Sequence, residues 1–336
     1  MTLNPLASIK DLKVHFPTKR RGKTVKAVDG VSLDIYPSTT LSIIGESGSG
    51  KSTLGRALVC LTKPTAGTIL HDGSDPFRLR SQAFRRHRRD YQVIFQDPHA
   101  ALDPRMTILE SVREPLDVIG DIAKHQREER AHALLERVGI APALHDRYPH
   151  QLSGGQKQRV NIARALTMRP KVLVCDEVVA ALDVSIQAGI LNLFADIQRD
   201  FGLTYVFITH DLSVAAHISD EIAVMYLGQI VERGPAEAIK AAPLHPYTHA
   251  LLSAEPEPLP SSMRRADRIK LTGDVPSPIS PPPACRFHTR CPRAEAICGR
   301  ETPTFRELTP GRWVACHFAS EMQRDAQSVN KLAVPM

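Results

Sequence analysis

Apolar residues recur over most of the chain with two alternating periods. Short apolar runs rich in β-branched residues predict strands, and they fall at residues 31–46, 90–96, 171–177, 203–210 and 221–234. Between them, apolar positions repeat every three or four residues, which predicts helices at residues 51–61, 125–140, 154–168 and 184–201. Strands that alternate with helices are typical of an α/β fold with a largely parallel sheet.

This alternation stops near residue 255, where prolines become frequent. The segments PEPEPLPSS and PSPISPPP fit neither a helix nor a central strand, because proline lacks the amide donor that both need. We therefore expect a first domain at residues 1–255 and a proline-rich connector at 256–283. A small cysteine-rich module is expected at 284–318, followed by a tail at 319–336.

The composition is that of an ordinary globular chain. Of the 336 residues, 42% are hydrophobic and 24% are charged, which excludes a collagen-like or largely disordered protein. No apolar run approaches the ~18 residues that cross a bilayer, and the first residues lack the basic-then-apolar layout of a secretory signal. We expect a cytoplasmic chain that does not span a membrane by itself.

The net charge of +7 permits an anionic partner without requiring one. Six arginines lie between Arg78 and Arg89, several of them at helical spacings, with Phe84 able to anchor the opposite side. A solvated helix face is the simplest interpretation of this run. Contact with an anionic partner is the alternative.

The segment GESGSGKST at residues 45–53 follows an apolar run and opens a predicted helix. It fits G-x-x-x-x-G-K-[ST], whose glycines let backbone N–H groups surround phosphates while the helix N-terminus adds positive potential. We expect Lys51 to reach the β- and γ-phosphates and Ser52 to give an oxygen to Mg²⁺. The expected nucleotide contacts are Gly45, Ser47, Gly48, Ser49, Gly50, Lys51, Ser52 and Thr53.

A second apolar run, VLVC, is followed directly by Asp176 and Glu177. Such a run predicts a buried strand that carries two carboxylates at its C-terminal end, where parallel sheets bind ligands. Asp176 suits coordination of Mg²⁺, and Glu177 is placed to polarise an attacking water molecule. Beside a phosphate loop, these roles are favoured over a pair of solvated acids.

The segment LSGGQ at residues 152–156 resembles the signature sequence of ABC-type ATPases, and other segments agree in order and spacing over about residues 8–255. The resemblance implies a P-loop ABC-type ATPase domain: a mixed sheet, N-terminal antiparallel strands and a helical subdomain at about 97–165. It also implies roles for further residues: Phe16 stacks on adenine, Gln96 senses Mg²⁺ and the γ-phosphate, Asp183 forms the D-loop and His210 is the switch histidine.

The signature residues are expected to serve a second subunit. They open a helix that begins near Gln156, so the hydroxyl and N–H groups there present donors to an anion. In the family, that anion is the ATP held by the phosphate loop of the partner, and two ATP molecules lie between head-to-tail subunits. The residues concerned are Ser153, Gly154, Gly155 and Gln156.

The downstream sequence is similar to ATP-binding subunits of oligopeptide/dipeptide importers, including VMYLGQIVERGPAEAIKAAPLHPYTHALLSAEP and CRFHTRC. The basic insertion in KVHFPTKRRGKTVKAVDG resembles the second of two ATPase subunits in such systems. The resemblance implies uptake of peptides or similar small solutes, driven by ATP hydrolysis. Expected partners are two permease subunits, a second ATPase subunit (or a second copy of this chain) and, indirectly, an external solute-binding protein.

These partners imply a peripheral location on the cytoplasmic face of the cell membrane, with no nucleic acid bound. The competing interpretation is a soluble ABC ATPase that acts on nucleic acid, with the cysteine module as a binding element. A regulatory subunit with an inactive site is a third, but it would require Lys51, Glu177 or His210 to be missing.

Three positions depart from the usual family pattern. Val178 replaces the proline that commonly follows the strand carboxylates, and Ala180 removes a serine hydroxyl from the D-loop, which weakens the expected communication between sites. Ser38 replaces a glycine in a turn, so that a positive φ there is in doubt. None of them removes a group expected to contact phosphate or metal.

Four cysteines gather in the C-terminal module: Cys285, Cys291, Cys298 and Cys316. In a cytoplasmic chain, such a group favours metal ligation over disulfides. Their spacing lacks the short C-x₂₋₄-C pairs of zinc modules and suits a [4Fe–4S] cluster, which the family resemblance also implies. Zinc, with His288 or His317 as a ligand, and reduced thiols remain the alternatives. We expect the cluster to hold together a proline-rich tail that has no core of its own.

Overall fold

The computed structural model describes residues 4–19, 22–180, 182–254, 269 and 271–324. A sheet of eight strands forms the centre, in the order β10-β11-β9-β8-β3-β7-β6-β5, and a second, antiparallel sheet has the order β2-β1-β4. The strands are β1 (Ala7–Pro17), β2 (Thr24–Ile35), β3 (Thr40–Ile44), β4 (Ala66–His71), β5 (Tyr91–Ile94), β6 (Val172–Asp176), β7 (Thr204–Thr209), β8 (Glu221–Tyr226), β9 (Gln229–Pro235), β10 (Arg306–Thr309) and β11 (Arg312–Val314).

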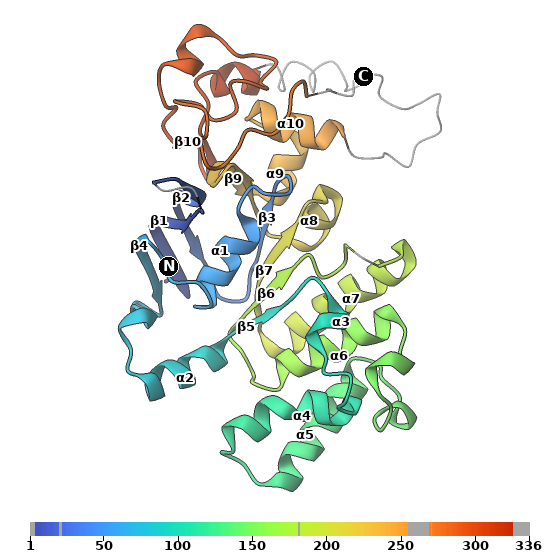
Figure 1. Ribbon diagram of the computed structural model, residues 1–336. Helices are drawn as coiled ribbons and strands as arrows, with labels where there is room; N and C mark the ends of the chain where they lie inside the picture. The colour runs from blue at the N-terminus through green and yellow to red at the C-terminus, as the bar shows by residue number, and fades with distance from the viewer. Residues whose placement is uncertain (1–3, 20–21, 181, 255–268, 270, 325–336) are drawn as a thin grey trace, which may run out of the picture.

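The helices lie on the sheets and in a separate helical body below them (Figure 1). They are α1 (Lys51–Leu58), α2 (Ser81–Asp90), α3 (Pro98–Ala101), α4 (Ile108–Ile119), α5 (Lys124–Arg137), α6 (Gly154–Leu166), α7 (Val184–Phe201), α8 (Leu212–Ile218), α9 (Ala236–Ala241) and α10 (Pro246–Ser253). Short 3₁₀ turns occur at Pro76–Arg78, Pro142–Leu144, Pro149–Gln151 and Ala296–Gly299. The expected α/β fold is confirmed.

Strands β3, β7, β6 and β5 run parallel to one another, and β8 is parallel to β3 on its other side. The segment expected to be a strand at 221–234 forms two antiparallel strands, β8 and β9, joined by a turn at Leu227 and Gly228. Because neighbouring parallel strands end at the same edge of a sheet, the residues that follow β3, β5, β6 and β7 gather at one edge.

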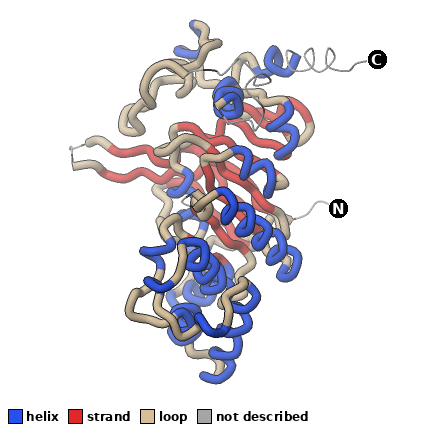
Figure 2. The backbone as a smooth tube through the Cα atoms, turned by 90° about the vertical axis from the view of Figure 1, so that its right-hand side faces the viewer, coloured by secondary structure: helices blue, strands red, loops and turns tan. Residues whose placement is uncertain are grey.

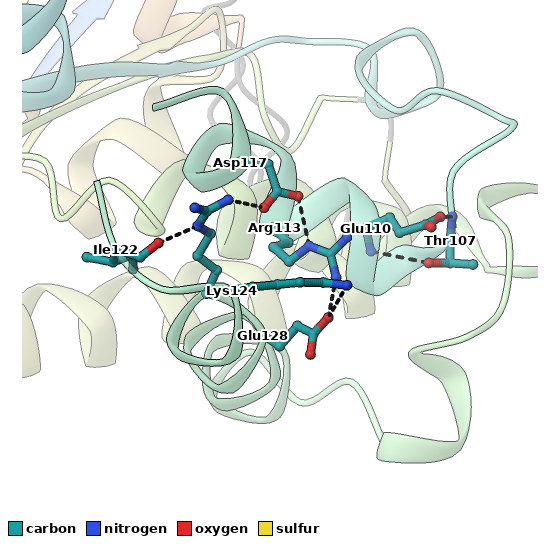
Figure 3. Close-up of polar contacts among 8 residues, drawn as sticks. Thr107, Glu110, Arg113, Asp117, Ile122, Lys124 and Glu128 are labelled. Carbon is teal, nitrogen blue, oxygen red and sulfur yellow. Dashed lines mark hydrogen bonds and ion pairs between the residues drawn. The ribbon is translucent and has the colours of Figure 1, made fainter. Parts of the chain in front are cut away.

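The helical body contains α3 to α6, and polar contacts between α4 and α5 hold its outer hairpin together (Figure 3). Arg113 on α4 bonds both Asp117 and Glu128, and Arg127 on α5 bonds Asp117 and the carbonyl of Ile122. The start of α4 is closed by a reciprocal capping box between Thr107 and Glu110. One face of α4 is thereby fixed against α5.

The arginine-rich segment forms α2, but the helix begins at Ser81, so Arg78 lies in the preceding 3₁₀ turn. No residue of α2 is buried, and Phe84 is only partly covered. Arg89 pairs with Asp121. The helix therefore presents a solvated basic face, as the simplest interpretation of the sequence predicted.

The C-terminal region departs most from expectation, because it is not a tail without a core. Strand β11 pairs with β9, so that β10 and β11 extend the central sheet. The ring of Phe287 is buried in a cluster with Tyr226 and Tyr247. Figure 2 shows this region lying against the strands of the main body, opposite the helical body. Strand pairing and an aromatic cluster hold the module against the main body. No local sequence pattern predicted either of them.

Much of the proline-rich connector, at residues 256–268, lies outside the described residues. The part at 271–283 contains neither helix nor strand, in agreement with the extended conformation that its prolines favour. No helix in the described part of the chain is both long and apolar enough to cross a membrane.

Candidate functional site

The phosphate loop connects the buried end of β3 to α1. Lys51 is 4% exposed, and its Nζ donates to the carbonyls of Gly45 at 2.7 Å and Glu46 at 3.0 Å. Burial lowers the pKa of Lys51, against the opposing effect of the carboxylates of Glu177, Asp176 and Glu46. The lysine of the loop is thus held by the loop's own backbone.

Glycine is required in this loop where other backbone segments come close. A Cβ atom on Gly45 would lie 2.1 Å from the carbonyl oxygen of Met225, and one on Gly50 would lie 1.9 Å from that of Ala27. Gly50 also has a φ of +104°, which few other residues adopt. Side chains at either position would push the loop away from the sheet.

Beside the loop, Asp176 at the end of β6 accepts a hydrogen bond of 2.8 Å from the hydroxyl of Ser52 on α1. Burial raises the pKa of Asp176, while the bond from Ser52 opposes that shift. The two residues that the sequence assigned to Mg²⁺ are therefore neighbours. A hydroxyl and a carboxylate oxygen are ligands that suit this ion.

Glu177, Gln96 and His210 meet although they come from the ends of three strands. The amide nitrogen of Gln96, after β5, donates to Glu177 Oε2 at 2.7 Å, and His210 Nδ1, after β7, lies 3.6 Å from Glu177 Oε1. Glu177 has a φ of +50°, a conformation that is costly for a residue with a side chain.

The other predicted nucleotide contacts differ in exposure. Phe16 is 41% exposed near the end of β1, as a ring that stacks on a ligand must be. Ser47 and Gly48 are exposed on the loop, whereas Ser49 is buried and Ser52 and Thr53 are half-buried. Asp183 is exposed and lies immediately before α7.

The signature segment opens α6, which begins at Gly154, where the helix predicted at residues 154–168 also begins. Ser153 caps the helix: its hydroxyl accepts from the N–H of Gln156 at 3.3 Å, and the Gln156 side chain accepts from the N–H of Ser153 at 2.9 Å. Gly155 packs against Ile186 of α7 too closely for any Cβ atom. Because α6 lies in the helical body, apart from α1, the signature and the loop of one chain are separated (Figure 1).

The three departures from the family pattern are accommodated differently. Ser38 keeps the positive φ that the sequence put in doubt, at +58°, with its N–H bonded to Thr204 Oγ1 and its hydroxyl to the carbonyl of Gly202. Val178 is buried in the hydrophobic core that the helical body shares with β6, β7 and α7. Ala180 is exposed, and its neighbour Ala181 lies outside the described residues.

A groove of about 970 Å³ runs between α2, β5 and the helical body. One wall carries Arg85, Arg86, Arg88 and Arg89 of α2, and the other carries Glu114, Pro115, Val118 and Ile119 of α4. Its apolar surface includes Val118, which is 79% exposed. Phe95, the residue before Gln96, also lines the groove.

The four clustered cysteines line one small cavity in the C-terminal module. All four are free thiols. Burial raises the pKa of Cys316 to about 12, and the neighbouring thiols of Cys285, Cys291 and Cys298 add to that shift. Within the described residues, no three His, Cys, Asp or Glu side chains stand close enough to share a single metal ion.

Sequence reasoning missed the residues that join this module to the phosphate loop. Arg290 bonds the carboxylate of Glu46, and the hydroxyl of Tyr247 accepts from the N–H of Glu46. Arg286 bonds Asp29 on β2. Two arginines four residues apart between cysteines were the only local signal, and their partners lie more than 200 residues away.

Two family models match the chain. Residues 28–180 match the model described as "ABC transporter", and residues 231–298 match the one described as "Oligopeptide/dipeptide transporter, C-terminal region". The chain is 46% identical over 321 residues to the oligopeptide transport ATP-binding protein AppF of Bacillus subtilis, covering 94% of this chain and 98% of that protein. It is 49% identical over 316 residues to a putative peptide import ATP-binding protein of Brucella ovis, with the same coverage.

Solved structures agree on the fold. The dimeric post-hydrolysis structure of the ATP-binding cassette MJ0796 bound to ADP and Pi is 31% identical, with a TM-score of 0.62, and covers 68% of this chain and 98% of that one. The structure of cbiO1 from Clostridium perfringens, part of the ABC transporter complex cbiONQ, is 29% identical with a TM-score of 0.63, and covers 70% of this chain and 90% of that one.

Proposed function

This chain belongs to the ABC transporter family, among the ATP-binding proteins that carry the oligopeptide/dipeptide C-terminal region, and we propose that it hydrolyses ATP to energise the import of peptides. The resemblance drawn from its motifs is confirmed. The observation that carries the proposal is the convergence of Gln96, Glu177 and His210 beside the Ser52–Asp176 pair.

At this edge each residue has a distinct role in the proposal. Lys51 would exchange its bonds to the loop carbonyls for bonds to the β- and γ-phosphates, and Ser52 and Asp176 would hold Mg²⁺. Glu177 orients the attacking water, and Gln96 and His210 fix the two carboxylate oxygens of Glu177. Phe16 supports the adenine ring from the exposed end of β1. The carboxylate, hydroxyl and amide oxygens here fit a magnesium nucleotide.

Hydrolysis by this arrangement needs a second ATPase subunit. The separation of the signature from the phosphate loop within one chain supports a site shared between two chains. Ser153 and the N–H groups at the start of α6 then face the phosphates of the partner's ATP. We propose a different ATPase chain as the partner, as the basic insertion near residue 20 suggests, and a second copy of this chain as the alternative.

The permease subunits are proposed to dock in the groove between α2 and α4. Its exposed apolar residues, such as Val118, suit the apolar face of a short helix, and its arginines suit acidic side chains. Because Gln96 follows β5 at the end of this groove, movement of the docked helix reaches Glu177 through one residue. Docked in this way, the chain would lie peripherally on the cytoplasmic face of the membrane.

We further propose that the four clustered cysteines hold a [4Fe–4S] cluster. The four thiols line one cavity and match the four cysteine ligands that such a cluster takes. When bound, it would tie together the loops that carry Cys285, Cys291, Cys298 and Cys316. Anaerobic protein is expected to be brown, with about four iron and four sulfide per chain.

Affinity purification from native membranes tests the proposed function. Two permease subunits and a second ATPase are expected to co-purify with the tagged chain. Recovery of nucleic acid, with no permease, would reverse the conclusion in favour of a soluble ABC ATPase that acts on DNA or RNA. The match to the transporter C-terminal region leaves that alternative without present support.

A further inference from the structure

The phosphate loop is held from two sides, and one of them is the C-terminal module. Arg290 donates from Nη1 to Glu46 Oε2 at 2.8 Å and from Nη2 to Oε1 at 3.2 Å. Glu46 is the second residue of the loop, and the Arg290 side chain is only 8% exposed. Two parallel bonds between a guanidinium and a carboxylate fix both partners in position as well as neutralising their charges.

The backbone of Glu46 is fixed as well. Its N–H donates to the hydroxyl of Tyr247 at 2.8 Å, and its carbonyl accepts from Lys51 at 3.0 Å. Tyr247 is buried against Phe287, with the ring centroids 5.3 Å apart. Glu46, whose carbonyl binds Lys51, is therefore held by Tyr247 of α10 and by Arg290 of the cysteine module.

A second arginine of the module reaches the other end of the nucleotide site. Arg286 bonds the carboxylate of Asp29 and the carbonyl of Leu227. Asp29 also lies 3.0 Å from Nε2 of His15, the residue before Phe16. Although burial alone would raise the pKa of Asp29, its contacts with Arg286 and His15 lower it below the ordinary value.

We propose that Arg290 is a positioning residue for ATP binding: it holds Glu46 and cancels its charge so that the loop can accept a triphosphate. The proposal rests on the proposed binding of ATP at this loop. An unpaired carboxylate in a loop that wraps phosphates would repel the ligand, and this repulsion is strong where water is excluded. Arg290 thereby links the docked cysteine module to nucleotide affinity.

A double-mutant cycle separates this role from simple structural support. The full chain, assembled with its membrane partners, is compared as wild type, Arg290→Gln, Glu46→Gln and the double variant. The readouts are the Kd of a fluorescent ATP analogue, KM and kcat for ATP, and the melting temperature. Arg290→Gln is expected to weaken ATP binding about tenfold with a smaller change in kcat. The double variant, which lacks the repelling charge, should recover to within about threefold of wild type.

Arg312 supplies the matched control. It is a buried arginine from β11 of the same region, bonded to Glu232 and to the carbonyls of Ala238 and Ala242, and within the described residues it makes no bond to the phosphate loop. Arg312→Gln should lower the melting temperature as Arg290→Gln does while leaving the Kd for ATP unchanged. Arg290→Lys, which keeps the charge with fewer bonds, tests the same point if the glutamine variant does not fold, and should weaken ATP binding about threefold.

The proposal is overturned if Arg290→Gln loses thermal stability but binds ATP as wild type does. It is equally overturned if removal of the Glu46 charge gives no recovery in the double variant. A wild-type chain that does not bind ATP would instead contradict the proposed function, so the two failures are distinguishable.

Discussion

The sheet edge that carries the candidate nucleotide site (below, the edge) and the C-terminal module are both built from residues far apart in the chain. They differ in how well the sequence alone predicts their structure. At the edge, each functional residue belongs to a local strand–loop unit, as with Lys51 after β3 and Glu177 after β6. In the module, Arg290 finds its partner Glu46 across 244 positions of sequence. The arrangement of the edge can be predicted from sequence motifs, whereas the contacts of the module are apparent only in the folded structure.

The difference has an energetic side. Parallel strands bring their ends together wherever the sheet forms, so the edge is assembled by the main core. The module instead relies on separate contacts: the pairing of β11 with β9, the burial of Phe287, and ion pairs from Arg286 and Arg290. Removing one of these contacts should weaken the docking of the module against the main body. ATP hydrolysis at the edge is instead proposed to depend on individual side chains.

The largest expected effect is at the edge. Glu177→Gln should lower ATP turnover by about 10²-fold or more while ATP binding persists, because the amide cannot accept the water's proton. Turnover and equilibrium binding of ATP measure the two halves of this prediction. Glu237→Gln, on the exposed first turn of α9, is the control that should change neither. Near-normal turnover in Glu177→Gln would remove Glu177 from its assigned role.

The next effect tests whether the edge is completed by a second chain. Ser153→Glu places a negative charge where the partner's triphosphate is expected, so turnover should fall about tenfold or more. Binding of ATP to the loop of the altered chain itself should stay close to normal. Full-rate hydrolysis by an isolated monomer, independent of protein concentration, would contradict the shared site.

A smaller effect is expected when a single cysteine of the module is replaced. Cys298→Ala should abolish the brown colour and the bound iron, and should lower the melting temperature of the chain. Because strand pairing and the Phe287 cluster remain, the intrinsic turnover of the folded complex should fall less than in Glu177→Gln. Cys60→Ala, at a lone buried cysteine, should retain the iron. Stoichiometric zinc in the wild-type protein would contradict the cluster and support zinc binding instead.

The smallest effect concerns the turn before β3. Ser38→Gly should raise the free energy of unfolding by up to about 1 kcal/mol, because glycine adopts a φ of +58° without strain. The lost bond from its hydroxyl to Gly202 offsets part of this gain. Ser38→Ala loses the bond without relieving the strain, so it should destabilise the chain. Urea denaturation distinguishes the two, and equal destabilisation by both would show that the turn is unstrained.

Most of the fold and nearly all of the edge were predictable because their signals are local. The run VLVCDE alone specifies a buried strand and two carboxylates, and GESGSGKST alone specifies a loop and a helix start. The sequence could not show that Glu177 adopts a positive φ, or that Gln96 and His210 each approach one of its oxygens. Those features depend on how three strands are ordered in the sheet.

The cysteine module shows the opposite limit. Its thiols were recognisable from residue type, but its prolines suggested a tail that only a cluster could hold. That expectation was wrong because β10 and β11 join a sheet whose other strands lie much earlier in the chain. Pairing of this kind depends on the exposed edge of β9, which no pattern within residues 284–318 reveals.

Uptake of a labelled peptide into proteoliposomes tests the central claim most directly. The vesicles contain this chain with its co-purified permeases and partner ATPase, oriented with the ATPases facing a lumen loaded with Mg-ATP, and the solute-binding protein and labelled peptide are added outside. Peptide transport should require Mg-ATP and should be lost with Glu177→Gln while the complex stays assembled. ATP hydrolysis that proceeds at full rate with no peptide movement, or transport that survives Glu177→Gln, would contradict it.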